Sequence, residues 1–372
     1  MKNLVVRPIQ AKQDTIAFIK FLWKIYKEDA AWVPPLIMDR QKLMDRKKNP
    51  FYSHATSEFF LAERGGQVVG RIAAIVNHNH NKEHHDKVGF FGFFECVNDQ
   101  EVANALFDRA KSFLKSQGME AMRGPASPSV NDEYGLLVEG FDKPATVLMT
   151  YNPAYYVELF TRYGLKKEKD LYAYLLSQET VYSEKFNRAN SIVRQRQSIE
   201  LHSLDMKHFD AEVARIKEIY NKAWAKNWGA VPMTDPEIDA LAADLKPVVV
   251  PELIIFAVKG GKTIGFGLAL PDINVALKYN KSGMLLPGLW HLFTKKKQID
   301  KVRIIVLGVL PEYLSTGAAG VLFYELAATA QKLGYRYGEA SWVLEDNVMM
   351  NRAAEAMHGV IDRRYRIFQI SI

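Results

Sequence analysis

The residues best suited to chemistry form a short run of small side chains between a strand pattern and a helix pattern. Residues 302–310 are apolar and β-branched, which predicts a buried strand, and residues 321–333 repeat leucine and alanine at helical spacing. Between them stand six small residues: Ser315, Thr316, Gly317, Ala318, Ala319 and Gly320. Such a loop can offer backbone N–H groups and the positive end of a helix to a phosphate. The alternative is an ordinary strand-to-helix turn whose small residues serve packing alone.

The spacing of this loop excludes two common phosphate-binding motifs. No Gly-Lys-Ser/Thr follows it, and its glycines do not fall as G-x-G-x-x-G. Carboxylates follow on the next predicted strand, residues 337–344, which carries Glu339 and is followed by Glu345 and Asp346. A carboxylate can accept the proton of an attacking amine. Alternatively, Glu339 is a solvent-facing strand residue, and Glu345 and Asp346 cap the following helix.

Residues 124–141 form a second unusual segment, rich in proline and glycine yet interrupted by polar side chains. These are Asn131, Asp132, Glu133 and Tyr134. Long loops within compact domains often bind ligands, so the segment is either a ligand-binding loop or a surface loop of turn-forming residues. A histidine-rich segment over residues 78–86 has a spacing that fits no closed metal site, so it predicts a hairpin loop and no metal.

Residues 284–301 combine an apolar run with basic side chains. Trp290 and Phe293 precede three consecutive lysines, and one acid, Asp300, stands between residues 275 and 303. The pattern predicts either a core helix with a solvated charged end or a segment that contacts an anionic membrane.

The composition describes a soluble globular chain of one or two domains. The 372 residues are 48% hydrophobic and 24% charged, with a net charge of +7 and an isoelectric point near 9.1. The basic balance permits a phosphorylated cofactor, an anionic membrane or a nucleic acid as partner, although no RNA-binding signature favours the last. A single cysteine, Cys96, fits a reducing cytoplasm, and neither a transmembrane run nor a signal peptide is predicted.

The order of predicted elements repeats, which indicates two copies of one domain. Predicted hairpins cover residues 58–77 and 253–270, each with a Gly-Gly turn, and matching glycines and asparagines in the two halves differ by 195 positions. We therefore predict domains over residues 1–177 and 199–372, joined by a polar linker over 178–198. The first half carries Glu95, Asp99 and Glu101 at the position of the phosphate loop, so it is expected to repel a pyrophosphate and to serve as scaffold and acceptor side.

These features resemble the GNAT superfamily of acyl-CoA N-acyltransferases. The family's pyrophosphate motif, Gln/Arg-x-x-Gly-x-Gly/Ala, falls on residues 314–319, with Leu314 at the first position. The family's later asparagine falls on Asn347, whereas the tyrosine common seven residues after it is Ala354 here. The segments WVPP, GFFGFFE, GPASPSVNDEYGLLVEGFD, YNPAYY and SWVLEDN further resemble the bacterial YghO-like group, which includes ceramide-synthase-like acyltransferases.

The resemblance implies an α/β fold with mixed sheets, built as two tandem GNAT domains. It implies acetyl-CoA or a longer acyl-CoA as co-substrate without a metal, and a primary amine as acceptor, with a sphingoid-base-like lipid amine as one option. Glu339, Glu345 and Asn347 are then the candidate catalytic residues. Val309, Leu310, residues 315–320 and Asn347 are expected to bind the cofactor, and residues 131–134 the acceptor.

We expect such an enzyme in the cytoplasm or at the inner face of the membrane. Two other functions stay open at this point. One is a Fem-type transferase that uses aminoacyl-tRNA, and the other is a non-catalytic protein that binds acyl-CoA or lipid.

Overall fold

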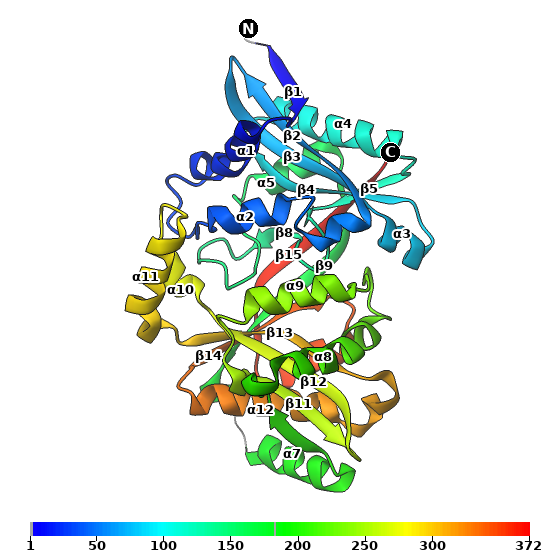
Figure 1. The fold of residues 1–372 in the computed structure, drawn as a ribbon, viewed down its shortest axis with the longest axis vertical. Coiled ribbons are helices and arrows are strands. Elements are labelled where there is room, and N and C mark those ends of the chain that lie inside the picture. The colour runs from blue at the N-terminus through cyan, green and yellow to red at the C-terminus, as the bar shows by residue number, and fades with distance from the viewer. Residues whose placement is uncertain (1–2, 182–183) are drawn as a thin grey trace. The chain divides into compact units, whose positions relative to one another are not determined.

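The computed structural model describes residues 3–181 and 184–372, which form two compact units (Figure 1). Unit 1 comprises Met1–Leu171, Ala276–Thr294 and Arg363–Ile372, and unit 2 comprises Tyr172–Val275 and Lys295–Asp362. The predicted halves, residues 1–177 and 199–372, follow the internal repeat rather than spatial contacts, and their boundaries stay a prediction.

Unit 1 is built on a mixed sheet. Its strands lie in the order β1 (Leu4–Pro8), β2 (Ala55–Arg64), β3 (Gln67–Asn77), β4 (Val88–Cys96), β5 (Ala121–Gly124) and β15 (Val360–Ser371). All these neighbours are antiparallel except β4 and β5, which are parallel. The predicted hairpin at β2–β3 is confirmed, and Gly65 and Gly66 turn it with φ of 59° and 78°, where glycine has no steric penalty.

Helices cover both faces of this sheet. Because side chains alternate along β2, Phe59 meets Phe18 of α1 (Lys12–Ile25), whereas Phe60 joins the core beneath α4 (Gln100–Ser116) and α5 (Tyr156–Tyr163). The unit also holds α2 (Ile37–Met44), α3 (His78–His84) and most of α11 (Leu285–Lys295). The predicted hairpin loop at the histidines is wrong: residues 78–84 form α3, because the Asn77 side chain caps its first N–H groups.

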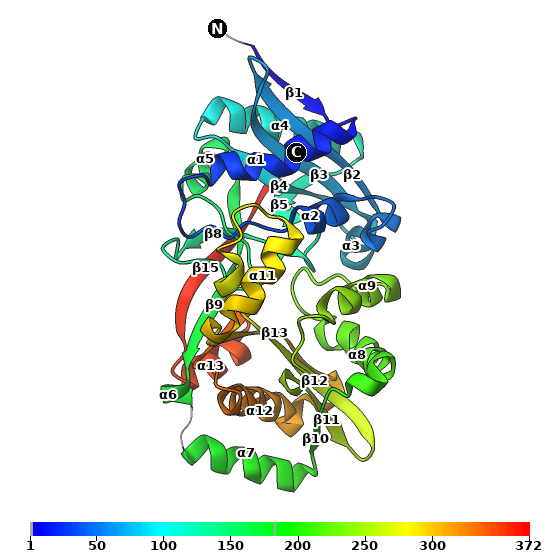
Figure 2. The same cartoon turned by 60° about the vertical axis from the view of Figure 1, so that its left-hand side comes forward.

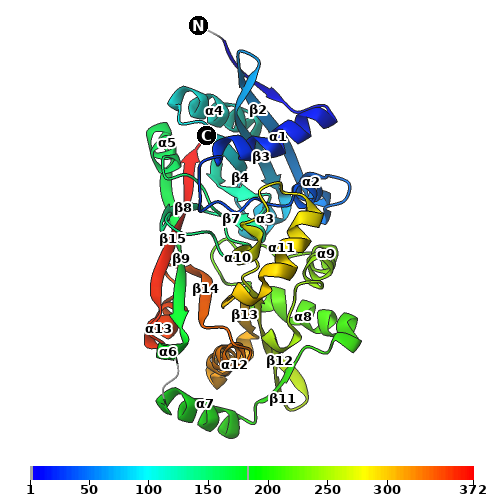
Figure 3. The same cartoon turned by 90° about the vertical axis from the view of Figure 1, so that its left-hand side faces the viewer.

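Unit 2 repeats this arrangement. Its strands lie in the order β9 (Lys166–Ser177), β14 (Tyr337–Leu344), β13 (Lys301–Val309), β12 (Lys262–Pro271), β11 (Ile254–Lys259) and β10 (Glu200–Ser203). The predicted β11–β12 hairpin is confirmed. Within this unit, α12 (Ala318–Lys332) packs Leu322 and Leu326 onto one sheet face, and α8 (Phe209–Trp224) covers the other (Figure 3).

The predicted linker is largely helical. It contains α6 (Gln178–Val181) and α7 (Glu184–Gln197), while its residues Tyr182 and Ser183 lie outside the described residues. Helix α7 packs against α12, where Arg194 Nη1 lies 3.7 Å from Glu325 Oε2. In the described ranges, every helix is too short or too polar to cross a lipid bilayer.

Candidate functional site

The candidate donor site starts where two parallel strands of unit 2 separate. Strands β13 and β14 pair from Lys301 with Tyr337 to Ile304 with Ala340, and within the described residues no further pair joins them. Opposite, on the β12 side, the register shifts between Leu268 and Ala269, which marks a bulge in this part of the ladder. Residues 305–309 of β13 therefore keep one edge unpaired by β14, and backbone groups on that edge can bind an extended ligand.

The small-residue loop follows directly from this open strand. A short 3-10 turn (Pro311–Thr316) leads to Gly317, whose φ of 78° brings the chain into α12. The N-cap residue Gly317 has no side chain to cap this helix, and the first internal hydrogen bond of the helix runs from Val321 N to Gly317 O at 3.2 Å. Ala318 N donates to Thr316 Oγ1 at 3.3 Å. Gly320 lies in the first turn, and a Cβ added there would meet nothing within 4 Å. The start of α12 is thus open, as anion binding requires.

The equivalent place in unit 1 is closed. Strands β4 and β5 also part after three residue pairs, but β6 (Ala126–Ser127) fills the gap: a Cβ on Gly92 would lie 1.7 Å from Ala126 O, and Phe93 N donates to Ser127 Oγ at 2.8 Å. At the start of α4, Asp99 Oδ1 accepts from two backbone N–H groups, and Arg64 binds the same carboxylate at 2.6 Å. In unit 1, the chain itself therefore fills the gap between the parallel strands and binds N–H groups at the start of the helix, whereas both places are open in unit 2.

Glu339 lies within a buried charged network of unit 2. Its side chain is 2% exposed, and Oε1 accepts from Ser341 Oγ at 2.8 Å. Arg303 Nε donates to the same serine hydroxyl at 2.9 Å, and Lys301 Nζ lies 3.9 Å from Glu339 Oε2 and 3.1 Å from Asp272 Oδ2. The alternation along β13 and β14 places these charges on the sheet face opposite α12, since Val302 and Ala340 belong to the core beneath that helix. The interpretation of Glu339 as a solvent-facing residue is therefore wrong.

Asn347 and Glu345 lie at the start of α13 (Val348–Ala356). The Asn347 side chain caps this helix by accepting from Met350 N at 3.2 Å, while Glu345 is half-buried. A neighbouring asparagine, missed in the sequence, makes more contacts: Asn351 accepts from Tyr174 Oη at 2.9 Å and donates to the carbonyls of Leu344 and Glu345. Only its place one helical turn after Asn347 could have indicated it.

The residues predicted to bind the acceptor lie in unit 1, where the expected loop contains short strands. Glu133 and Tyr134 form β7, which pairs with β6. Glu133 forms an ion pair with Arg40. The Ser129 hydroxyl donates to Asp132 Oδ2 at 2.6 Å and accepts from Asn131 N at 3.1 Å. Tyr134 is 6% exposed, and its hydroxyl has no hydrogen-bond partner among the described residues.

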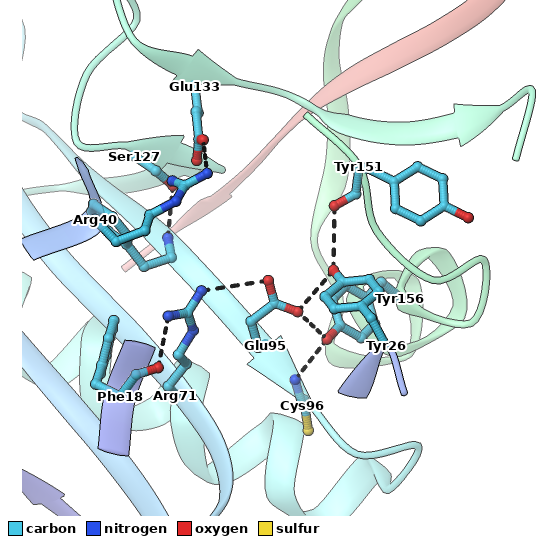
Figure 4. Close-up of polar contacts among 11 residues, drawn as sticks. Phe18, Tyr26, Arg40, Arg71, Glu95, Cys96, Ser127, Glu133, Tyr151 and Tyr156 are labelled. Carbon is cyan, nitrogen blue, oxygen red and sulfur yellow. Dashed lines mark hydrogen bonds and ion pairs between the residues drawn. The ribbon is translucent and has the colours of Figure 1, made fainter. Parts of the chain in front are cut away.

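Unit 1 also contains a buried polar cluster centred on Glu95, which the sequence did not predict (Figure 4). Glu95 Oε2 accepts from Tyr26 Oη at 2.9 Å and from Tyr156 Oη at 2.7 Å, while Oε1 lies 3.5 Å from Arg71 Nη2. Burial raises the pKa of Glu95, although Arg71 and the two tyrosines oppose that shift. Arg40 lies beside this cluster, so Glu133 of the predicted acceptor segment borders it. The Glu95 carboxylate lies at a predicted strand end, the one signal that could have identified it.

A small apolar cavity lies in unit 2, beneath α12. Leu176, Val302, Phe323, Ala330 and Gly338 contribute to its lining, so it lies on the α12 side of the sheet, near the paired ends of β13 and β14. Ile304, the last residue of β13 that pairs with β14, also lines the cavity, which therefore reaches the point where the two strands separate. Its lining is apolar, and we do not assign the donor to it. Within the described ranges, no group of three or more His, Cys, Asp or Glu side chains is arranged to hold a metal ion.

Two known proteins match the chain over almost its whole length. A bacterial ceramide synthase of Caulobacter vibrioides is 35% identical over 378 residues, covering 99% of this chain and 97% of the relative. Protein YghO of Escherichia coli is 31% identical over 376 residues, covering 99% of this chain and 95% of the relative. No profile of a known protein family matches the chain.

Solved structures with a similar fold include GNAT proteins. A tandem GNAT protein from the clavulanic acid biosynthesis pathway matches with a TM-score of 0.58 at 11% identity, covering 99% of this chain and 98% of that one. A GCN5-related N-acetyltransferase from Sphaerobacter thermophilus matches with a TM-score of 0.53 at 12% identity, covering 99% of this chain and 95% of that one. The predicted tandem GNAT fold is thereby confirmed. The chain belongs to the family of the bacterial ceramide synthase and Protein YghO, and it is an acyltransferase of GNAT type.

Proposed function

We propose that the protein transfers an acyl group from acyl-CoA to a primary amine, and that unit 2 binds the acyl-CoA. The observation that carries this proposal is the continuous path from the open edge of β13 to the start of α12, where Gly317 supplies no capping side chain. An extended pantetheine arm can pair with residues 305–309, including Val309, while Leu310 continues the same backbone. Residues 315–320 would then offer N–H groups to the pyrophosphate. The closed counterpart in unit 1 supports a single donor site.

The proposed reaction needs few groups. The neutral amine attacks the thioester carbonyl, an N–C bond forms, and backbone N–H groups of β13 stabilise the oxyanion. The C–S bond then breaks, and the proton lost by the amine protonates the departing thiolate directly or through a base. Glu339 is buried between Ser341 and Lys301, so it is suited to holding this charged network in place. We infer that Glu345, which is half-buried at the end of β14, is the more accessible carboxylate of the two.

The acceptor that best fits the family is a long-chain amine. The relative from Caulobacter vibrioides is named a ceramide synthase, which points to a sphingoid-base-like lipid amine for this chain as well. In unit 1, the buried Tyr134 hydroxyl lacks a partner among the described residues, and Glu133 offers a carboxylate beside Arg40. A polar amine head group could satisfy that hydroxyl. Asn131, Asp132, Glu133 and Tyr134 remain the proposed acceptor residues.

The test is product formation by the full-length protein. Palmitoyl-CoA or acetyl-CoA is supplied with a sphingoid base, free thiol is measured as CoA leaves, and the amide is identified by mass spectrometry. We expect stoichiometric thiol and amide with the long-chain donor. Turnover with aminoacyl-tRNA but without CoA release would favour the Fem-type function instead. Tight acyl-CoA binding without transfer to any amine would favour a binding protein.

A pair of substitutions separates the two carboxylates. Glu345→Gln should lower kcat with a smaller loss of stability than Glu339→Gln, because the Glu345 side chain is half-buried whereas that of Glu339 is buried. Glu339→Gln should lower stability, because Lys301 and Arg303 lose a buried counter-charge. Equal, small effects of both substitutions on kcat would remove both from the proposed mechanism.

A further inference from the structure

Helix α11 exposes large apolar side chains on its outer face. Leu286 is 77% exposed, Leu289 51%, Trp290 65% and Phe293 82%. These positions follow the spacing i, i+3, i+4 and i+7, so they form one stripe on the helix. Surface helices normally expose their polar face, and a contiguous apolar stripe of this kind indicates a surface that binds a partner.

The opposite face of α11 packs against other residues of unit 1, so the apolar stripe faces away from them. Gly288 is buried, and a Cβ added there would lie 3.2 Å from Leu36 Cδ2. The chain just before the helix is tied to α1 and α2 by hydrogen bonds from Trp23 Nε1 to Lys281 O at 2.7 Å and from Ile37 N to Gly283 O at 2.9 Å. Figure 2 shows α11 along the side of unit 1, with its neighbours α1 and α2 in the same unit. The stripe is therefore held away from the core of that unit.

The charge of this segment indicates the kind of partner. Residues 275–299 contain five lysines and no acid, and three of the lysines, 295–297, directly follow the stripe in the chain. Lys296 and Lys297 are exposed. An apolar stripe with an indole and a phenyl ring, ended by lysines, matches the boundary between acyl chains and anionic head groups. A protein partner would need an apolar groove with acidic residues at one end, for which the chain offers no further sign.

We propose that α11 docks the protein on the surface of an anionic lipid bilayer. Leu286, Leu289, Trp290 and Phe293 enter the head-group and upper acyl region, and Lys296 and Lys297 contact lipid phosphates. This goes beyond acyl transfer and does not depend on it, because the apolar stripe of α11 lies in unit 1, and Lys296 and Lys297, which follow it in unit 2, are not part of the proposed donor site. For an enzyme with a lipid amine as acceptor, docking would place it on the surface that holds its substrate.

The test is co-sedimentation of the full-length protein with vesicles. Vesicles of phosphatidylcholine and phosphatidylglycerol in equal parts should bind the protein, whereas pure phosphatidylcholine should bind it weakly. Trp290→Ser with Phe293→Ser should lower the partition coefficient by more than about tenfold, because the variant loses the two rings that would be buried in the bilayer. A control with Val5→Ser and Met349→Ser removes two apolar side chains elsewhere that are 52% and 80% exposed, and this variant should bind normally.

Charge reversal tests the second half of the proposal. Lys296→Glu with Lys297→Glu should weaken binding to the anionic vesicles by about thirtyfold or more, since each lysine near the surface contributes about 1 kcal/mol. Lys115→Glu with Lys332→Glu changes the net charge equally at exposed sites on α4 and α12 and should have little effect. Brominated lipids should quench the fluorescence of Trp290, and Trp290→Phe should remove that component.

Three results would overturn the proposal. These are absence of vesicle binding by the unmodified protein, equal binding by the Trp290→Ser, Phe293→Ser variant, and a stable dimer in sedimentation that this variant dissociates. The last result would assign the stripe to a second copy of the chain. Failure of acyl-CoA binding would leave vesicle binding intact, so the two proposals fail separately.

Discussion

Gly320 offers a substitution that should abolish donor binding while stabilising the fold. It lies in the first turn of α12 with open space around its missing Cβ. Leucine in a helix is more favourable than glycine by roughly 0.5–1 kcal/mol, so Gly320→Leu should raise the free energy of unfolding by about that amount. The new side chain would project into the space in front of the helix start, where we place the pyrophosphate.

Substitution at Gly317 cannot separate these effects, which is why Gly320 is preferable. Gly317 has a φ of 78°, and a Cβ there would lie 3.2 Å from Val193 Cγ1. A leucine would cost about 1–2 kcal/mol for the left-handed backbone alone. Loss of binding in Gly317→Leu would therefore combine a damaged turn with a blocked site.

The assay compares thermal and urea unfolding with and without palmitoyl-CoA. A donor at about a hundred times its dissociation constant should stabilise the unmodified protein by about 2.7 kcal/mol. Gly320→Leu should show a higher intrinsic stability and lose most of that ligand-dependent gain. Gly320→Ala is the matched control, because it adds the same helix preference with a single methyl group. If Gly320→Leu kept the full gain, the pyrophosphate could not bind at the start of α12.

Three further predictions concern unit 1. Burial lowers the pKa of His80 to about 4, so between about pH 6.5 and pH 4 the unfolded chain binds a proton that the folded chain does not. The free energy of unfolding, measured by urea titration, should therefore fall by up to about 3 kcal/mol as the pH drops through that window. His80→Gln should flatten this pH dependence, whereas His85→Asn, at an exposed histidine, should not. Gly92→Ala should lower the free energy of unfolding in urea by about 3 kcal/mol, because the added methyl group would clash with the backbone carbonyl of Ala126. An unchanged urea midpoint would contradict the closed gap between β4 and β5. Asp99→Ala should lower the melting temperature through loss of about 1 kcal/mol of capping, whereas Asp99→Asn should keep the cap; equal losses would assign the effect to charge instead.

The sequence predicted the fold well where local signals agreed. The Gly-Gly turns, the β-branched run before Pro311 and the repeated order of elements all led to the observed hairpins and to β13 and α12. The helix at residues 78–84 was missed because its histidines and asparagines have poor helix preference, and only the Asn77 cap identifies it. The strands within residues 124–141 were missed because segments of two residues carry no periodic signal.

The candidate site was predictable only in part. The small residues at 315–320 indicate the open helix start directly, because small side chains leave the backbone N–H groups accessible. The Glu95 cluster and the Arg303 network depend on residues distant in sequence that meet across strands: Tyr26 lies 69 positions from Glu95, and Arg303 lies 38 from Ser341. A sequence shows that such charges exist, but pairing across a sheet depends on register, which becomes fixed only in the folded structure.

The two units show how one fold can gain or lose a ligand site without changing its core. Both contain a pair of parallel strands that separate after three or four residue pairs, followed by a helix. In unit 1, Gly92 allows the chain after β5 to lie against β4, and Asp99 satisfies the N–H groups of the helix. In unit 2, Gly317 turns the chain into α12 without supplying a cap, so the same N–H groups stay available. A bound donor can supply what the first unit supplies from its own chain, which is why donor binding should stabilise unit 2 more than unit 1. Hydrogen exchange with palmitoyl-CoA should show that protection in β13 and the start of α12, and none in β4 and the start of α4.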